Sequence, residues 1–473
     1  MNVLLVTIDC LRRDRCGIYD HHRDTTPTLD SLGREGFVFD NAYATGPVTT
    51  ESFPGILAGR LSAQTVAGDN LYQKCLPEGA PTIASHLRDE GWDTTAVISN
   101  PRIGEHTGAD RGFESFQNLR NADGGSSDEP SGSGSSVLPD FEVGERLYQL
   151  RERMRDLDSL PYRYEMPFLA FRYYQYYSGW PSVRGEAVVD EFLDALADCS
   201  SPFFGWTHLM DVHGPLHPKT VAEGGLSDGG TFTQFRSHAR RVSNLHDSRV
   251  EARYDSTVRY VDDQLRRIVD WLKSNDLWDE TALVVTADHG DALYDRGIYG
   301  HPQHYMYDEL LSVPLVVRVP GVAGDRIDRL FSLGWLHEFV AELGAVPEMD
   351  APVSSSYETH LPRRNSGDGD EGTLLADSIS HRGHSVVARR GDEKFVLHTG
   401  ELERSEEVNV GPYGHYLLGA DPTERVSDGV GESNLERPAR EIVVEPESLR
   451  GRADVSGIDD AAADRLKQLG YAE

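Results

Sequence analysis

Short apolar segments that end near an aspartate recur along this chain, and they limit the possible folds more than any other feature. Residues 3–8 form a continuous apolar and β-branched run that ends directly at Asp9. A run that is apolar at every position is typical of a strand inside a parallel sheet with both faces covered. Two further runs are followed in the same way, residues 202–207 by Asp211 and residues 283–286 by Asp288.

Helical patterns alternate with these strands. Residues 82–90 are predicted to form a helix before a strand at 94–99, and residues 251–275 have the apolar periodicity of a long amphipathic helix. A further strand is predicted at 313–319. The alternation predicts an α/β fold, with a doubly wound sheet flanked by helices. In such sheets ligands bind beyond the carboxyl ends of the strands, which is where the three aspartates are expected.

The length of 473 residues exceeds what a single core usually serves, so one large and one smaller domain are expected. We predict a catalytic α/β domain at 1–350, a linker at 351–376 and a small C-terminal α+β subdomain at 377–473. Short antiparallel strands are expected at 385–388 and 394–398. The large domain should carry an insert at about 121–182, which begins with a Gly-, Ser- and Asp-rich surface loop at 121–136 and continues as an aromatic, helix-prone segment at 142–180. The polar, Gly-rich residues 354–372 account for the linker prediction.

The charge balance is strongly acidic, with 78 acidic against 46 basic residues and a net charge of -32. Nearly all of the positive charge is arginine. Such a surface suits a protein from a salt-loving source, because concentrated salt screens the self-repulsion. The alternative is an ordinary acidic protein. Either surface argues against nucleic acids and anionic membranes as partners.

The compartment is predicted from what the sequence does not contain. The four cysteines show neither a CxxC pair nor zinc-ligand spacing. The first residues lack the basic start of a signal sequence, and no apolar run of about 18 residues suggests a membrane helix. We therefore expect a cytoplasmic protein without membrane insertion; nothing in the sequence indicates its oligomeric state.

An aspartate and a histidine stand together after the apolar run at 283–286. Asp288 and His289 precede Gly290, which permits a sharp turn, so that both side chains can reach one divalent cation. Asp9 is a candidate third ligand at the same sheet edge. Its alternative role is to cap the turn that follows it.

Hydroxyl groups precede a predicted helix within residues 46–60. Thr49, Thr50 and Ser52 lie where the positive end of the helix favours an alkoxide or a bound anion. Helix capping is the alternative role of all three, and it is favoured when this segment is taken alone. Further polar residues follow the strand ends and are candidates for acid, anion-binding or metal-binding roles. These are His208, Asp211, His213, His217, His301 and His304.

Taken together, these motifs resemble the sulfatase-like family of the alkaline-phosphatase superfamily over most of the chain. The resemblance is carried by the opening strand with Asp9, Arg12 and Asp14, by framework segments, and by several site segments in the family's order. These segments are Thr26-Pro27, Gly36-Phe37, Arg111-Gly112-Phe113, Asp211-Val-His213-Gly-Pro215, Ala287-Asp288-His289-Gly290, His301, Tyr307-Asp-Glu309, Val313-Pro314-Leu315 and Gly419-Ala-Asp421-Pro422.

The resemblance implies a hydrolase acting on ester bonds, with one divalent cation (Mn, Mg, Ca or Zn) held by Asp9, Thr49, Asp288 and His289. Family sulfatases carry a Cys or Ser that is oxidised to formylglycine, and this position falls on Thr49, with Thr50 as the alternative alignment. The second acidic residue of many sulfatases is replaced by Cys10, which weakens a hard calcium site. His213 and His301 are expected to bind the anion or to protonate the leaving group, and Asp211 with His213 and His217 are the candidates for a second metal.

These departures favour phosphoryl chemistry, since threonine cannot supply formylglycine and no lysine is close to the site segments along the sequence. The predicted function is therefore metal-dependent cleavage of phosphate monoesters or diesters through Thr49, with an anionic ester as the binding partner. A sulfatase, a phosphoglycerol-type transferase and a non-catalytic anion-binding relative are the alternatives.

Overall fold

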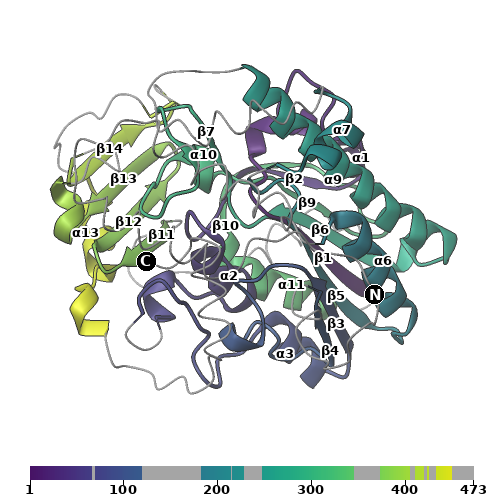
Figure 1. Ribbon diagram of the computed structural model, residues 1–473. Coiled ribbons are helices and arrows are strands. Elements are labelled where there is room, and N and C mark those ends of the chain that lie inside the picture. The colour runs from purple at the N-terminus through teal and green to yellow at the C-terminus, as the bar shows by residue number, and fades with distance from the viewer. Residues whose placement is uncertain are drawn as a thin grey trace, which may run out of the picture.

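The computed structural model describes residues 1–66, 70–119, 183–214, 216–227, 248–345, 373–404, 411–419, 423–424 and 433–449. Within these residues, a large sheet is covered by helices on both faces, and a small antiparallel sheet from the C-terminal part of the chain lies beside it (Figure 1). The predicted surface loop at 121–136, the insert at 142–180 and the polar segment at 354–372 lie outside the described residues.

The large sheet has the strand order β10-β2-β9-β6-β1-β5-β3-β4. β9 is antiparallel to both of its neighbours, and all the other pairings are parallel. The predicted α/β class is confirmed. In chain order the strands are β1 (Asn2–Ile8), β2 (Phe37–Tyr43), β3 (Asp93–Ile98), β4 (Ser115–Asn118), β5 (Phe203–Leu209), β6 (Thr281–Ala287), β9 (Leu315–Arg318) and β10 (Arg326–Ser332).

β1 lies in the middle of the large sheet, and its sequence accounts for that place. All of its residues are buried, as expected for a strand that is apolar on both faces. Its pairing with β6 aligns Ile8 with Ala287, and its pairing with β5 aligns Ile8 with Leu209. The residues that follow these three strands are therefore brought to one edge of the sheet.

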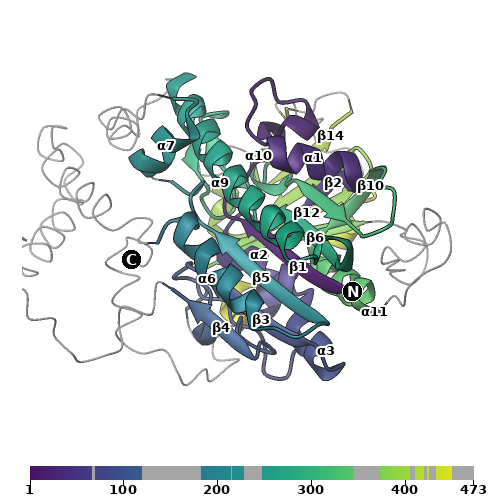
Figure 2. The same ribbon diagram turned by 90° about the vertical axis from the view of Figure 1, so that its right-hand side faces the viewer.

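Two layers of helices cover the large sheet. Helices α1, α6 and α7 pack against the long helix α9 in one layer, and α2 and α3 pack against α11 in the other (Figure 2). No helix among the described residues is long and apolar enough to cross a membrane. The helices are α1 (Pro27–Glu35), α2 (Thr49–Ala58), α3 (Ile83–Asp89), α6 (Gly185–Ala197), α7 (Pro218–Gly224), α9 (Ser248–Ser274) and α11 (Leu336–Ala345).

The small sheet is antiparallel, in the order β11-β12-β13-β14, and α13 (Glu436–Ile442) packs on β12 and β13. β12 and β13 correspond to the two strands predicted for the C-terminal subdomain. β11 begins slightly before the predicted boundary at 377. The strands are β11 (Leu374–Ser380), β12 (Gly383–Arg390), β13 (Glu393–His398) and β14 (Tyr413–Leu417).

A buried ion cluster joins the small sheet to the large domain. Lys394 of β13 is fully buried, and its Nζ lies 2.6 Å from Oδ1 of Asp308 and 2.5 Å from Oε1 of Glu424. Asp308 begins the short helix α10 (Asp308–Leu311). Burial lowers the pKa of Lys394, but the negative charges of Asp308 and Glu424 outweigh this and raise the pKa above its ordinary value.

Replacing Lys394 with Met should lower the free energy of unfolding by about 3–5 kcal/mol, because it removes the closest positive partner of Asp308 and Glu424. The remaining partners, Arg389 and Arg296, lie farther away, at 3.5 Å from Asp308 and Glu424 respectively. Urea unfolding measures this change without altering ionic strength. The matched control is Lys219→Met, which removes an exposed side chain that pairs with Glu223 at the surface and should leave stability unchanged. Equal stability of the two variants would show that the buried cluster contributes nothing.

Candidate functional site

Asp9 and Asp288 meet at the edge of the large sheet because β1 and β6 are aligned up to their last residues. Both carboxylates are completely buried. The backbone N–H groups of Cys10 and His289 donate to Oδ1 of Asp288 at 3.3 and 2.9 Å. Asp9 does not begin or cap a helix, since the next helical turn starts at Arg13 with Arg12 before it. The capping alternative for Asp9 is therefore wrong.

Helix α2 brings Thr49 to these carboxylates. Thr49 is its first residue, and Gly59 caps its C-terminal end with a φ of 62°, in the left-handed region that favours glycine. The Thr49 hydroxyl does not cap the helix. Its Oγ1 lies 3.4 Å from Oδ2 of Asp9 and 3.2 Å from Nε2 of His289. Ser52 donates to the backbone carbonyl of Asp288 at 2.5 Å and so ties the helix to the Asp-His turn.

His289 is oriented for binding a cation. Its Nδ1 lies 2.7 Å from the carbonyl oxygen of Gly290, which can only accept, so Nδ1 carries a proton. In the neutral imidazole the lone pair is then on Nε2, which lies 3.5 Å from Oδ2 of Asp288 and 3.8 Å from Oδ1 of Asp9. Fixing one ring nitrogen on a carbonyl is the usual way to orient a metal-binding histidine.

The electrostatics of the cluster call for a positive charge. Burial raises the pKa of Asp288, and the negative charge of Asp9 raises it further. Within the part of the chain that the structure describes, Oδ2 of Asp288 is buried and has no hydrogen-bond donor. A carboxylate oxygen in that condition is costly unless it binds a cation. Asp9, Asp288, His289 and the Thr49 oxygen therefore fit a divalent cation in both chemistry and spacing.

Two buried polar side chains contact the carboxylate of Asp9. Nδ2 of Asn100 donates to Oδ2 of Asp9 at 3.1 Å, and Nε2 of His208 lies 3.3 Å from the same oxygen. Burial raises the pKa of Asp9, but His213, His208 and His289 together lower it below its ordinary value. The carboxylate is therefore kept ionised, as a metal ligand must be.

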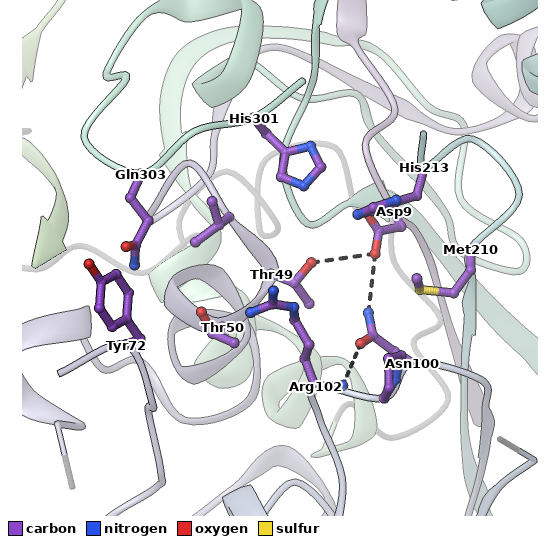
Figure 3. Close-up of a pocket in the computed structure, with 12 residues that line it drawn as sticks. Asp9, Thr49, Thr50, Tyr72, Asn100, Arg102, Met210, His213, His301 and Gln303 are labelled. Atoms are coloured by element: carbon purple, nitrogen blue, oxygen red, sulfur yellow. Dashed lines mark hydrogen bonds between the residues drawn. The ribbon is translucent and has the colours of Figure 1, made fainter. Parts of the chain in front are cut away.

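A pocket of about 240 Å³ opens above Thr49 and Asp9 (Figure 3). His213 and His301 line it, with their ring centroids 4.7 Å apart. Burial lowers the pKa of His213 to about 4, and burial with the charge of His289 lowers that of His301 to about 3. The side chain of Arg102 projects into the same space. The remaining lining residues are Val48, Thr50, Tyr72, Asn100, Pro101, Met210 and Gln303.

Four of the polar residues predicted after strand ends do not line this pocket. One of them, His208, contacts the carboxylate of Asp9, and the other three lie elsewhere. Asp211 turns away, and its carboxylate accepts from the backbone N–H of Gly185 at 2.7 Å and from Thr220 at 3.3 Å. His217 caps helix α7 by accepting from the N–H of Lys219. Among the described residues, the groups able to hold a metal include His213 but neither Asp211 nor His217. The geometry thus speaks against the predicted second metal at Asp211. The third residue, His304, is buried against the serines of the small sheet.

Asn100 and Arg102 belong to the site but were not among the predicted residues. Both follow the end of β3, which was predicted as a strand and pairs with β5 so that Ile98 is aligned with His208. The same strand-end rule that points to Asp9 and Asp288 would have pointed to them. Tyr72, Met210 and Gln303 line the pocket from loops and have no such signal.

A model of the sulfatase family matches residues 1–343. The chain belongs to the sulfatase family of hydrolases. This confirms the resemblance inferred from the motifs.

Individual relatives of this sulfatase-family chain are distant. It is 25% identical to human iduronate 2-sulfatase, over 68% of this chain and 60% of that protein. It therefore spans about 60% of the length of that relative. An arylsulfatase of Clostridium perfringens is 24% identical, over 77% and 79% of the two chains. The solved phosphonate monoester hydrolase of Agrobacterium radiobacter has a similar fold, with a TM-score of 0.57, 18% identity, and coverage of 90% and 91%.

Replacing Asp288 with Asn should abolish the binding of a divalent cation, since the amide removes the charge that faces the cluster. Elemental analysis after dialysis measures the metal content of each variant. Asp211→Asn is the matched control, because it makes the same change in a buried aspartate outside the pocket, and it should retain the metal. Stoichiometric metal in Asp288→Asn would contradict the ligand assignment, and loss of metal in Asp211→Asn would restore the second site.

Proposed function

We propose that this chain is a metal-dependent hydrolase that cleaves phosphate esters, with Thr49 as the nucleophile. The observation that carries the proposal is the position of the Thr49 hydroxyl. It stands at the first turn of α2, on the floor of the pocket, within 3.4 Å of both Asp9 and His289. An alkoxide there is favoured by the helix N-terminus and by any cation that Asp9, Asp288 and His289 bind.

The nature of residue 49 supports phosphate over sulfate. Oxidation of a cysteine or serine gives an aldehyde, whereas the extra methyl of threonine prevents aldehyde formation. Thr49 can therefore act only through its own oxygen. Such an oxygen can form a phosphoester with substrate, in the manner of other hydroxyl nucleophiles.

The reaction proceeds in two steps. Oγ1 of Thr49 forms a bond to phosphorus while the bond from phosphorus to the ester oxygen breaks, and the alcohol departs with a proton. Water then attacks the phosphothreonine and releases inorganic phosphate or a phosphate monoester, which restores the hydroxyl. Asp9, Asp288 and His289 would hold a divalent cation, which when bound would lower the pKa of the threonine hydroxyl and neutralise charge on the phosphoryl oxygens.

Three pocket residues support these steps. Arg102 offers a planar guanidinium suited to phosphoryl oxygens, and its charge is close enough to lower the pKa of His301. His301 is oriented by Asp291, whose Oδ1 lies 3.0 Å from its Nδ1. His213 and His301 face the pocket and are assigned to bind the substrate oxygens or to carry the proton of the leaving group.

Sulfate-ester cleavage is the second candidate, because iduronate 2-sulfatase and arylsulfatase are among the relatives. Transfer to an alcohol rather than to water remains compatible with the same pocket. A non-catalytic anion-binding role is disfavoured, since the cluster keeps a nucleophile, candidate metal ligands and a cationic side chain together.

Thr49→Ala should reduce kcat for phosphate-ester hydrolysis on the order of 10³-fold or more, as removal of a nucleophile does in other hydrolases. Thr49→Ser keeps the hydroxyl and should retain much of the activity. Steady-state kinetics, with circular dichroism to confirm folding, compare the two variants. Full activity in Thr49→Ala, or loss confined to Thr50→Ala, would transfer the role to another group.

The substrate class is tested by comparing kcat/KM for four aryl esters with the same leaving group: a phosphate monoester, a phosphodiester, a phosphonate monoester and a sulfate. We expect one of the two phosphate esters to be turned over fastest, by about tenfold or more over the sulfate, equivalent to about 1.4 kcal/mol of transition-state stabilisation. Faster turnover of the sulfate would establish the second candidate. Adding glycerol and analysing the products distinguishes transfer from hydrolysis.

A further inference from the structure

Cys10 occupies an unusual position directly after Asp9. Its side chain is completely buried, and its φ of 62° is in the left-handed region that only a few non-glycine residues adopt. Cys10 is a free cysteine, so no disulfide imposes this conformation. Its backbone is held by Asp288, which accepts from its N–H, and by Tyr254, which donates to its carbonyl oxygen. Strained backbone positions concentrate at functional sites, where the surrounding structure holds them in place.

The sulfur of Cys10 points into the carboxylate-imidazole cluster. Sγ lies 3.0 Å from Oδ1 of Asp9 and 3.5 Å from Nδ1 of His301. Its sulfur forms one group of possible metal ligands with His289 and His301, and another with Asp9 and His213, each with all ligand atoms within 4.8 Å. The other cysteine sulfurs face backbone carbonyls instead.

A second observation indicates that the same cluster needs a cation. Oδ2 of Asp288 is fully buried and, among the residues that the structure describes, receives no hydrogen bond. This oxygen lies 3.5 Å from Nε2 of His289, and His289 belongs to one of the groups of possible metal ligands that contain the Cys10 sulfur. The unpartnered oxygen calls for a positive charge there, independently of the cysteine.

We propose that Cys10 is a thiolate ligand of the cation held by Asp9, Asp288 and His289. The inference rests on the proposed function, because it requires that cation site. On binding, the S–H bond breaks, a bond from sulfur to the metal forms, and the proton leaves to solvent. Thiolate is a soft ligand and imidazole an intermediate one, whereas calcium and magnesium prefer oxygen alone. The mixed set of sulfur, nitrogen and oxygen therefore selects a thiophilic metal such as zinc.

The competing explanation is that the thiol only donates a hydrogen bond to Asp9. Both explanations agree with the 3.0 Å distance between Sγ and Oδ1, but they differ in what a bound metal contacts. Cobalt(II) distinguishes them, because its visible bands report binding at the site, whereas a near-ultraviolet charge-transfer band appears only when sulfur is bound directly.

The experiment titrates cobalt(II) into the full chain after removal of metal with a chelator. We expect both sets of bands in the unaltered protein, and loss of only the charge-transfer band in Cys10→Ser. Cys199→Ser, which removes a partly exposed cysteine away from the site, is the control and should keep both. Visible bands without the charge-transfer band in the unaltered protein, or a charge-transfer band that persists in Cys10→Ser, would overturn the proposal while leaving the cation site intact. Absence of all bands would overturn the cation site itself and the cysteine ligand with it.

Metal preference provides a second readout that does not depend on activity. Cys10→Asp exchanges the sulfur for a carboxylate, and aspartate tolerates the left-handed conformation better than most residues. We expect the ratio of zinc to calcium affinity, measured by competition with a chromogenic chelator, to fall by about tenfold or more, which is the range seen even for indirect metal contacts. An unchanged ratio would overturn the proposed ligand role.

Discussion

The alignment of β1 with β6 is the constraint on which the rest of the site depends. Ile8 and Ala287 are the last residues of β1 and β6, and they are paired. The residues that follow them, Asp9 and Asp288, are therefore brought together at the carboxyl ends of the two strands. Two carboxylates buried together repel each other and lose their hydration. Their charge must be balanced locally. The groups that surround the two carboxylates serve that purpose: His289, the N-terminus of α2, and the side chains of Asn100 and His208.

The small sheet takes part in positioning the nucleophile. Glu51, two residues after Thr49, is fully buried and accepts from the backbone N–H of Ile379 in β11 at 3.2 Å and from Gln303 at 3.0 Å. Lys74 lies 3.7 Å from the same carboxylate. Burial raises the pKa of Glu51 to about 7, against the opposing effect of Lys74. The first turn of α2 is thus tied to the small sheet and to the loop that carries His301, so that the three parts form one support for the pocket.

Features of the fold and of the site could be predicted where they depend on residues that are close together in the sequence. Continuous apolar runs identified β1, β5 and β6, and their ends led to Asp9 and Asp288, because a buried strand and the residue at which it ends follow from a local pattern. Asp211 shows the limit of the rule: it follows β5 equally closely, yet the turn directs its carboxylate to the start of α6. The direction of a side chain after a strand depends on the packing of distant helices, which no local pattern contains. The interior position of His304 depends in the same way on the small sheet.

The acidic surface and the proposed anionic substrate have to be considered together. A net charge of -32 repels an approaching phosphate ester in dilute buffer. At an ionic strength of 1 M the Debye length is about 3 Å, so the surface carboxylates are screened, whereas charges inside the pocket still act at contact distance. Arg102 and a cation between Asp9 and Asp288 would then decide binding almost alone. The predicted adaptation to salt is therefore compatible with the proposed binding of an anionic ester by Arg102 and a bound cation.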